Sequence, residues 1–339
     1  MFFFHHSCGY IDKYAGWRWI EWTHMIASGV VFVMELFFFK ETRGAKILMD
    51  RAKALRKETG DQSIRAPAEL ESESVKDLLK KSSSRAVMLL IHEPVVLAFG
   101  LWIGLAWGIT FLFLSVIPLT FAGNHGWSEG NAGLPYLALI LACFIGFGTG
   151  LWADKKYDQV QEENDGVAIP EYRLYGSMFF TPFLPIGLFI FAFTQYSHVH
   201  WIAPIIALVP ILVGIYSIFL AVYNYTADSY GELSSSAIAG QGFIRNTFGA
   251  VTPLFATYMF KGMGYQFAGL LLALLTLLMA PLPFILFRYG AAIRARSDYA
   301  SATTGALPAR KRSGSMESKA LSTPAAKKAA INKQNEEKV

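Results

Sequence analysis

The chain has 339 residues, of which 53% are hydrophobic and 16% are charged, and its net charge is +5. Because soluble domains contain about 25% charged residues, this composition indicates a protein with several membrane spans and argues against a soluble fold. The two cysteines, Cys8 and Cys143, provide no disulfide framework.

The first span is expected over residues 20–39, which is about the length that crosses a bilayer as one helix. Trp17, Trp19 and Trp22 cluster at its start, as is typical of the membrane interface. A strongly basic segment follows from Lys40 on, which predicts that the span ends at the cytoplasmic face. The residues before it lack the basic start and the cleavage site of a signal peptide, so we interpret them as the end of an earlier span.

The amino-acid composition divides the rest of the chain into three segments. Residues 40–86 are too charged to enter a membrane and are expected to form a partly helical cytoplasmic linker. Residues 87–296 are expected to contain six spans, and residues 297–339 a disordered cytoplasmic tail. These second to seventh spans are expected at 87–121, 132–153, 175–196, 201–225, 236–260 and 265–287. The second span, 87–121, is too long for one crossing, so we expect its start to project into the cytoplasm.

The distribution of lysine and arginine supports this orientation. If the first span runs inward, the cytoplasmic segments contain 26 of the 30 Lys and Arg residues, the outer segments contain 3, and Arg245 lies within a span. The only N-x-S/T sequon, at Asn224, then lies at a cytoplasmic end, where we expect no glycosylation. The run Arg310-Lys311-Arg312 in the tail is a candidate for contact with anionic lipid or for a phosphorylation-sensitive switch, and the alternative is a solvated tail.

Ionisable residues inside apolar spans are informative, because each is costly unless it faces a partner or water. At about 100° per residue, Glu21, His24 and Glu35 share one face of the first span with Ser28. This pattern favours a proton or cation pathway with a titratable histidine. In the alternative interpretation, the two glutamates lie near the interfaces and extend to the headgroups.

Glu93 and Arg245 are the second candidate pair. The expected spans place them roughly 10 Å and 13 Å from the cytoplasmic face, and this matched depth predicts an ion pair within about 4 Å. Gln241 lies one helical turn from Arg245. Asn224 and Asp228 lie one turn apart at the inner end of their span and are expected to cap and anchor that helix.

Aromatic and hydroxyl side chains are expected to line a substrate cavity if their helix faces point inward, although packing is the usual role of aromatic residues. They are Trp107, Phe111 and Ser115 on the second span and Tyr216 and Ser217 on the fifth.

Signatures of catalysis and metal binding are weak. His198 and His200 form an H-x-H pair, which supplies too few ligands for a metal site. The sequence contains no catalytic triad signature, nucleotide-binding loop or HExxH motif. We therefore expect neither an enzyme nor a bound metal.

Seven motifs carry a resemblance to a known family. In chain order they are GWRWIEW from residue 16, LMDRAKALRKETGD from 48, HEP from 92, PEYRL from 170, NYTADSY from 224, FIRNTFGAVTPLF from 243 and FRYGAAIR from 287. Together they resemble the sixth to twelfth spans of the fungal twelve-span drug:proton antiporters of the major facilitator superfamily. The chain looks like an N-terminally truncated member, with one six-span half and one extra helix.

The resemblance implies an all-α membrane protein of seven transmembrane helices, six of which form the C-terminal half of the bundle as two inverted repeats. It implies efflux of drugs, polyamines or similar small molecules in exchange for protons across the plasma membrane, without a cofactor and without nucleic acid. It also implies that a complementing N-terminal half is needed. Asp154 lies in GLWADKK, which is similar to the superfamily's gating loop, although Tyr157 begins a departure from the usual pattern.

Two alternatives remain. A seven-span receptor fits the topology, but the long basic loop follows the first span, and neither an Asp-Arg-Tyr nor an Asn-Pro-x-x-Tyr signature is present. A non-transporting fragment fits the same sequence features.

Overall fold

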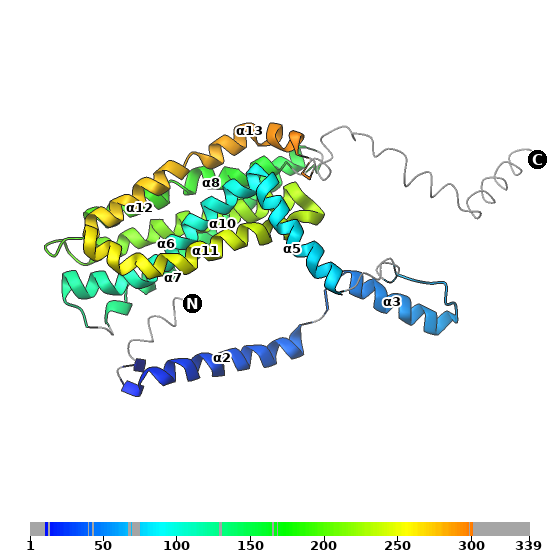
Figure 1. The fold of residues 1–339 in the computed structure, drawn as a ribbon, viewed down its shortest axis with the longest axis horizontal. Coiled ribbons are helices and arrows are strands. Elements are labelled where there is room, and N and C mark those ends of the chain that lie inside the picture. Colours follow the sequence, from blue (N-terminus) through cyan, green and yellow to red (C-terminus); the bar gives the residue numbers. More distant parts are fainter. Residues whose placement is uncertain are drawn as a thin grey trace, which may run out of the picture.

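The computed structural model describes residues 11–12, 14–39, 41–42, 44–66, 69, 75–128, 131–164, 166–167, 169–297 and 299–300. Within these ranges the chain forms helices and no β-strand, so the predicted all-α fold is confirmed. Figure 1 shows a bundle of long helices with α2 and α3 outside it. The tail predicted after residue 300 lies outside the described residues.

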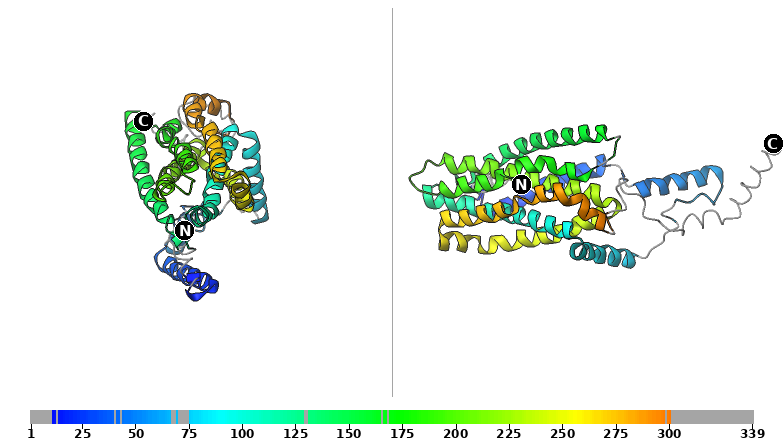
Figure 2. Two further views of the ribbon diagram at one scale, coloured as in Figure 1. Left: turned by 90° about the vertical axis from the view of Figure 1, so that its left-hand side faces the viewer. Right: turned by 90° about the horizontal axis from the view of Figure 1, so that it is seen from above.

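Several helices precede the bundle in the described part of the chain. α2 (Trp17–Phe38) coincides with the first expected span, and α3 (Gly44–Thr59) and α5 (Val75–His92) begin within the expected linker. α2 lies apart from the bundle in Figure 1 and in the left view of Figure 2, and none of its residues is buried.

The bundle contains long helices, several of which proline bends or divides. α8 (Tyr175–Phe180) and α9 (Phe183–Phe193) share one expected span that breaks at Pro182. α12 (Tyr265–Met279) and α13 (Leu282–Arg296) share another that breaks at Pro281. Proline causes such breaks because it lacks the N–H that a helix needs. The other elements are α6 (Pro94–His125), α7 (Tyr136–Glu163), α10 (Ile202–Tyr230), α11 (Ser234–Met263) and the 3-10 helices η1 (Asn131–Gly133), η2 (Pro170–Leu174) and η3 (Gly231–Leu233).

Six helical stretches of the described chain are long and apolar enough to cross a membrane. The fifth, Ile202–Met263, has 62 residues and contains both α10 and α11, separated by η3. A single helix of that length would measure about 93 Å, roughly three times the thickness of a bilayer core. This stretch is therefore long enough for two crossings, one by each of its two helices.

Two helix boundaries differ from those that the expected spans suggested. Glu93 separates α5 from α6 and has extended backbone angles, φ −102° and ψ 103°, because a residue before proline is pushed out of the helical region. Glu93 therefore lies at the start of a span and not inside it. α7 continues to Glu163, so Asp154 lies within a helix, where the sequence predicted a loop.

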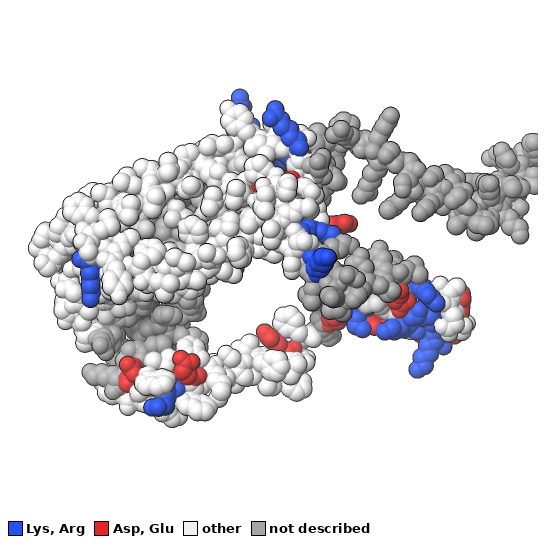
Figure 3. Space-filling view, in the orientation of Figure 1, with Lys and Arg blue, Asp and Glu red and all other residues white. Residues whose placement is uncertain are grey.

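Glycine lets neighbouring helices of the bundle approach closely. A Cβ atom at Gly104 of α6 would lie 3.1 Å from Ile244 of α11, and one at Gly214 of α10 would lie 2.6 Å from the backbone nitrogen of Leu184 in α9. Small residues at helix contacts are typical of membrane bundles, because packing between helices provides much of their association energy. The face of the bundle visible in Figure 3 carries few charged side chains along its length, whereas α3 carries many.

Candidate functional site

Polar side chains meet at one end of the bundle, where α6 and α11 begin and α7, α10 and α13 end; we call it the η2 end. Nε of Arg173 in η2 donates to Oδ2 of Asp228 in α10 at 2.8 Å, and its Nη1 donates to Oδ1 of Asp154 in α7 at 3.3 Å. The Asp228 side chain is 21% exposed and that of Asp154 is 51% exposed. Because exposed ion pairs contribute little, the contact with Asp228 is the stronger one.

Tyr157 of α7 contacts both Arg173 and Asp228. Its hydroxyl donates to Oδ2 of Asp228 at 2.8 Å, and its ring lies 3.5 Å from Cζ of Arg173. A guanidinium at this distance from an aromatic ring is attracted by the electrons of the ring face. One carboxylate oxygen thus receives two donors, and three elements are joined at a single point.

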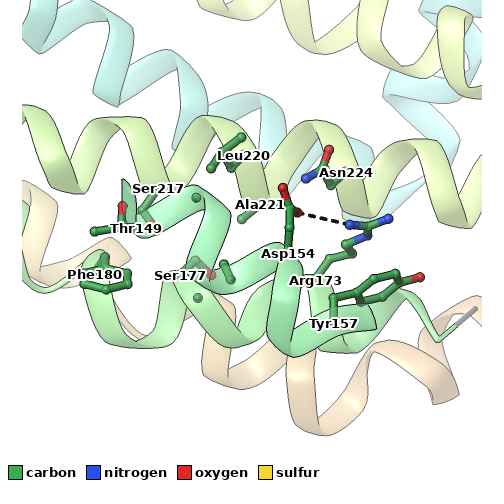
Figure 4. Close-up of a pocket in the computed structure, with 13 residues that line it drawn as sticks. Thr149, Asp154, Tyr157, Arg173, Ser177, Phe180, Ser217, Leu220, Ala221 and Asn224 are labelled. Carbon is green, nitrogen blue, oxygen red and sulfur yellow. Dashed lines mark hydrogen bonds and ion pairs between the residues drawn. The ribbon is translucent and has the colours of Figure 1, made fainter. Parts of the chain in front are cut away.

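A cavity of about 20 Å³ lies beside Arg173 and is shown in Figure 4. Ser217, an expected cavity residue, and Asn224, an expected capping residue, line it together with Thr149. This volume accommodates about one water molecule and is far smaller than a pocket for a drug-sized ligand. In this conformation these residues therefore line a water-sized site.

A second polar group at the η2 end is a buried ion pair. Nε and Nη2 of Arg294 in α13 donate to the two carboxylate oxygens of Glu171 in η2, at 2.9 Å and 2.7 Å. The hydroxyl of Tyr225 in α10 donates to Glu171 at 3.4 Å. The side chains are 6% exposed for Glu171 and 10% for Arg294. Two parallel hydrogen bonds give such a pair a defined geometry, which ties α13 to η2.

Glu93 is the third polar group, and its predicted ion pair with Arg245 is not formed. Its carboxylate is 3% exposed and accepts hydrogen bonds from Tyr230 at 3.0 Å and from Ser297 at 2.5 Å. Arg245 instead lies beside Trp107, which is about 21 Å further along α6 than Glu93. The depth of Glu93 was misjudged because the expected span began before Pro94.

Arg245 takes part in an aromatic cluster in the middle of the bundle. Its Cζ lies 5.2 Å from the ring centroid of Trp107, and its Nη1 donates to the hydroxyl of Tyr223. The ring of Trp107 also lies 5.3 Å from that of Phe111 and 5.1 Å from that of Phe219. Two of the expected cavity residues, Trp107 and Phe111, therefore come together, with partners that the sequence did not indicate.

The other candidate residues lie elsewhere. Tyr216 packs against α7, where a Cβ atom at Gly146 would lie 2.9 Å from its ring. Ser115 is half-buried in α6. Gln241 is buried and donates to Thr226 of α10 at 3.0 Å, which joins α10 to α11.

The expected stripe on the first span lies on α2, where none of the residues is buried. Glu21 and Glu35 of α2 are exposed, and His24 is half-buried with its Nδ1 3.0 Å from the carbonyl oxygen of Ile20. A pathway role of this stripe stays a prediction.

Four residues of the η2 end were missed by the sequence analysis: Tyr157, Glu171, Arg173 and Arg294. A signal for two of them was present, because PEYRL places a glutamate and an arginine two residues apart at the entrance to an apolar span. Charged residues at such a position need partners, and NYTADSY and FRYGAAIR supply Asp228, Tyr225 and Arg294.

Metal binding finds no support in the described part of the chain, where no group of three or more His, Cys, Asp or Glu side chains is arranged to hold an ion. The rings of His200 and Trp201 lie 5.0 Å apart.

Comparison with protein families gives a match to the Major Facilitator Superfamily over residues 8–250. The chain belongs to the major facilitator superfamily. Among fungal members, it is 39% identical over 293 residues to a multidrug transporter of Candida glabrata, covering 86% of this chain and 50% of that protein. It is 35% identical over 288 residues to a multidrug transporter of Aspergillus fumigatus (85% and 47%), and 36% identical over 299 residues to an efflux pump of Aspergillus terreus (86% and 63%). The chain spans about half the length of most of these superfamily relatives.

Proposed function

We propose that residues 94–296 form one half of a transporter that exports drugs, polyamines or similar small molecules in exchange for protons. Relatives that cover most of this chain are named multidrug transporters or efflux pumps. Alternating access needs two halves that move around a central site, so in this proposal the chain acts together with a complementing N-terminal half. No catalytic step belongs to this function.

The observation that carries the proposal is the polar network at the η2 end. Arg173 joins α7 to α10, and Arg294 joins α13 to η2. A gate needs contacts that hold one end of the bundle closed in one state and exchange partners in the other. In our proposal Asp154 and Asp228 belong to this gate. The cluster of Trp107, Phe111 and Arg245 lies deeper and faces the substrate.

An efflux assay in a host without its own pumps tests this function. We expect no export by the chain alone, and export that a protonophore abolishes when the chain is co-expressed with the N-terminal half of the Aspergillus fumigatus relative. Asp228→Asn should reduce that export because Arg173 loses its charged partner. Asp158→Asn on the exposed face of α7 is the matched control and should leave export unchanged. Export by the chain alone at the rate of the pair would contradict the proposal.

We also propose that the η2 end and the tail face the cytoplasm of a cell whose plasma membrane holds the protein. The support is the distribution of 26 Lys and Arg residues in the segments on that side and 3 on the other. Glycosylation acceptors inserted at residues 124–130 should be modified, and acceptors inserted after residue 300 should not. The reverse pattern would show that the orientation is wrong.

A further inference from the structure

A hydroxyl group is central to the attachment of the segment after α13 to the bundle. Oγ of Ser297 donates to Oε1 of Glu93 at 2.5 Å, and it accepts the backbone N–H groups of Tyr299 at 3.1 Å and Ala300 at 2.9 Å. Ala300 is fully buried, and the hydroxyl of Tyr299 lies 3.7 Å from Sδ of Met88 in α5. We call Ser297, Tyr299 and Ala300 the strap.

The strap borders a groove at the η2 end. The groove has a volume of about 720 Å³, and its lining includes His92 and Tyr289 in addition to Ser297 and Tyr299. Ser297 is half-buried and lines this open space together with its acceptor Glu93, which is 3% exposed. The hydrogen bond between them therefore lies beside a groove that admits another molecule.

The residues before Ser297 are basic. Arg294 lies three positions and Arg296 one position before it, which is a setting that basophilic serine kinases recognise. Arg296 is exposed, whereas Arg294 is held by Glu171. The same spacing occurs once more in the tail, where Arg310 and Arg312 precede Ser313, outside the described residues.

We propose that Ser297 is a phosphorylation site for a basophilic serine kinase and that its modification releases the strap. Oγ of Ser297 forms a bond to the γ-phosphorus of a nucleoside triphosphate. The bond from that phosphorus to the bridging oxygen breaks, the nucleoside diphosphate leaves, and the hydroxyl proton passes to the base of the kinase.

Release follows from charge and from the loss of the donor. The modified oxygen has no proton to donate to Glu93, and a phosphate group brings about −1.5 to −2 charges next to that carboxylate. Like charges repel strongly where water is excluded. The strap therefore leaves its position, and the contacts of Tyr299 with α5 and of Ala300 with the bundle are lost.

The tail itself provides the matched experiment, because it contains two serines in the same basic setting. The full chain carrying Ser313→Ala is purified in lipid nanodiscs and treated with the catalytic subunit of a cyclic-AMP-dependent protein kinase and ATP. Mass spectrometry should find phosphate on Ser297, formed more slowly than on Ser313 of the unchanged chain, because the pair with Glu171 competes for Arg294. Hydrogen exchange at the amides of Tyr299 and Ala300 should then become about tenfold faster or more, as expected when buried groups lose their hydrogen bonds.

The control is the chain with Ser297→Ala, in which the same treatment modifies Ser313. This substitution removes the hydroxyl, so exchange at the strap is faster from the start, but it should not change further on treatment. Phosphate on Ser313 with none on Ser297, or phosphate on Ser297 with unchanged exchange, would overturn the proposal. An equal rise in both variants would also overturn it. These readouts do not involve transport, so they are independent of the proposed function.

Discussion

α2 and α6 are both apolar enough to cross a membrane, yet they differ in what surrounds them. Their most apolar windows have mean hydropathies of 1.3 and 2.1, but 0% of the α2 window and 61% of the α6 window is buried. Glycines of α6 face α11 at close range, including Gly104, whereas Gly29, the one glycine of α2, has nothing within 4 Å of where its Cβ would be. Hydropathy therefore decides whether a helix enters a bilayer, and surface shape decides what it packs against.

Charged residues show the same contrast. Glu171 and Arg294 are buried and bind each other, whereas Glu21 and Glu35 on α2 are exposed. The bundle satisfies this pair of charges internally, and α2 presents its glutamates at its surface. Substitutions in the two regions should consequently have very different effects on stability.

Glu171→Ala is expected to have the largest effect. It leaves the guanidinium of Arg294 buried without its carboxylate, which should cost about 3–5 kcal/mol of unfolding free energy. Chemical unfolding in detergent micelles measures this, with Glu35→Ala on α2 as the control. A double variant with Glu171→Leu and Arg294→Met should recover most of the loss, because both charges are then removed. Equal effects of Glu171→Ala and Glu35→Ala would contradict the contrast between the two regions.

Gly214→Ala should have the next largest effect. Its new Cβ atom would lie 2.6 Å from the backbone nitrogen of Leu184, and backbone cannot move aside as a flexible side chain can. Overpacking of this kind costs about 1–3 kcal/mol. Gly29→Ala adds a methyl group where there is open space, and it should be neutral or stabilise α2 by about 0.5–1 kcal/mol. The thermal unfolding temperatures of the two variants should therefore shift in different directions or by clearly different amounts.

A smaller effect is expected in the linker between α2 and the bundle. Arg56 donates two hydrogen bonds of 2.8 Å to Glu69, and these bonds lower the pKa of the Glu69 carboxyl below its ordinary value. A lowered pKa means that the contact stabilises the linker above the ordinary pKa of glutamate, about 4.3. That contribution is lost as the pH falls through the lowered pKa.

NMR titration of the Glu69 carboxyl measures this shift directly. In the Arg56→Gln variant the pKa of Glu69 should move back toward the ordinary value. An unchanged pKa in that variant would show that the guanidinium is not the cause.

The smallest effect is expected when α2 is removed. A chain that lacks residues 1–39 should unfold at the same temperature as the complete chain, because no residue of α2 is buried. Differential scanning fluorimetry in the same detergent makes the comparison. A clear decrease would mean that α2 packs against the bundle in the membrane.

Much of the architecture was predictable from the sequence because span length and apolar composition are local properties. The first expected span, residues 20–39, coincides with most of α2. The break at Glu93 was also predictable from the sequence, since Pro94 restricts the backbone of the residue before it. The sequence analysis missed it because it joined the apolar runs on either side of His92 and Glu93 into one span.

The sequence by itself determined that this protein is an all-helical membrane protein of the major facilitator superfamily, because hydrophobic runs and ordered motifs can be read along the chain. Only the tertiary structure decided which charges meet. Arg294 binds Glu171, which lies 123 positions earlier, and Glu93 binds Tyr230 and Ser297 instead of Arg245. Such partners depend on the relative depth and rotation of separate helices. An error of a few residues in one span boundary moves a side chain by several ångströms and is enough to assign it the wrong partner.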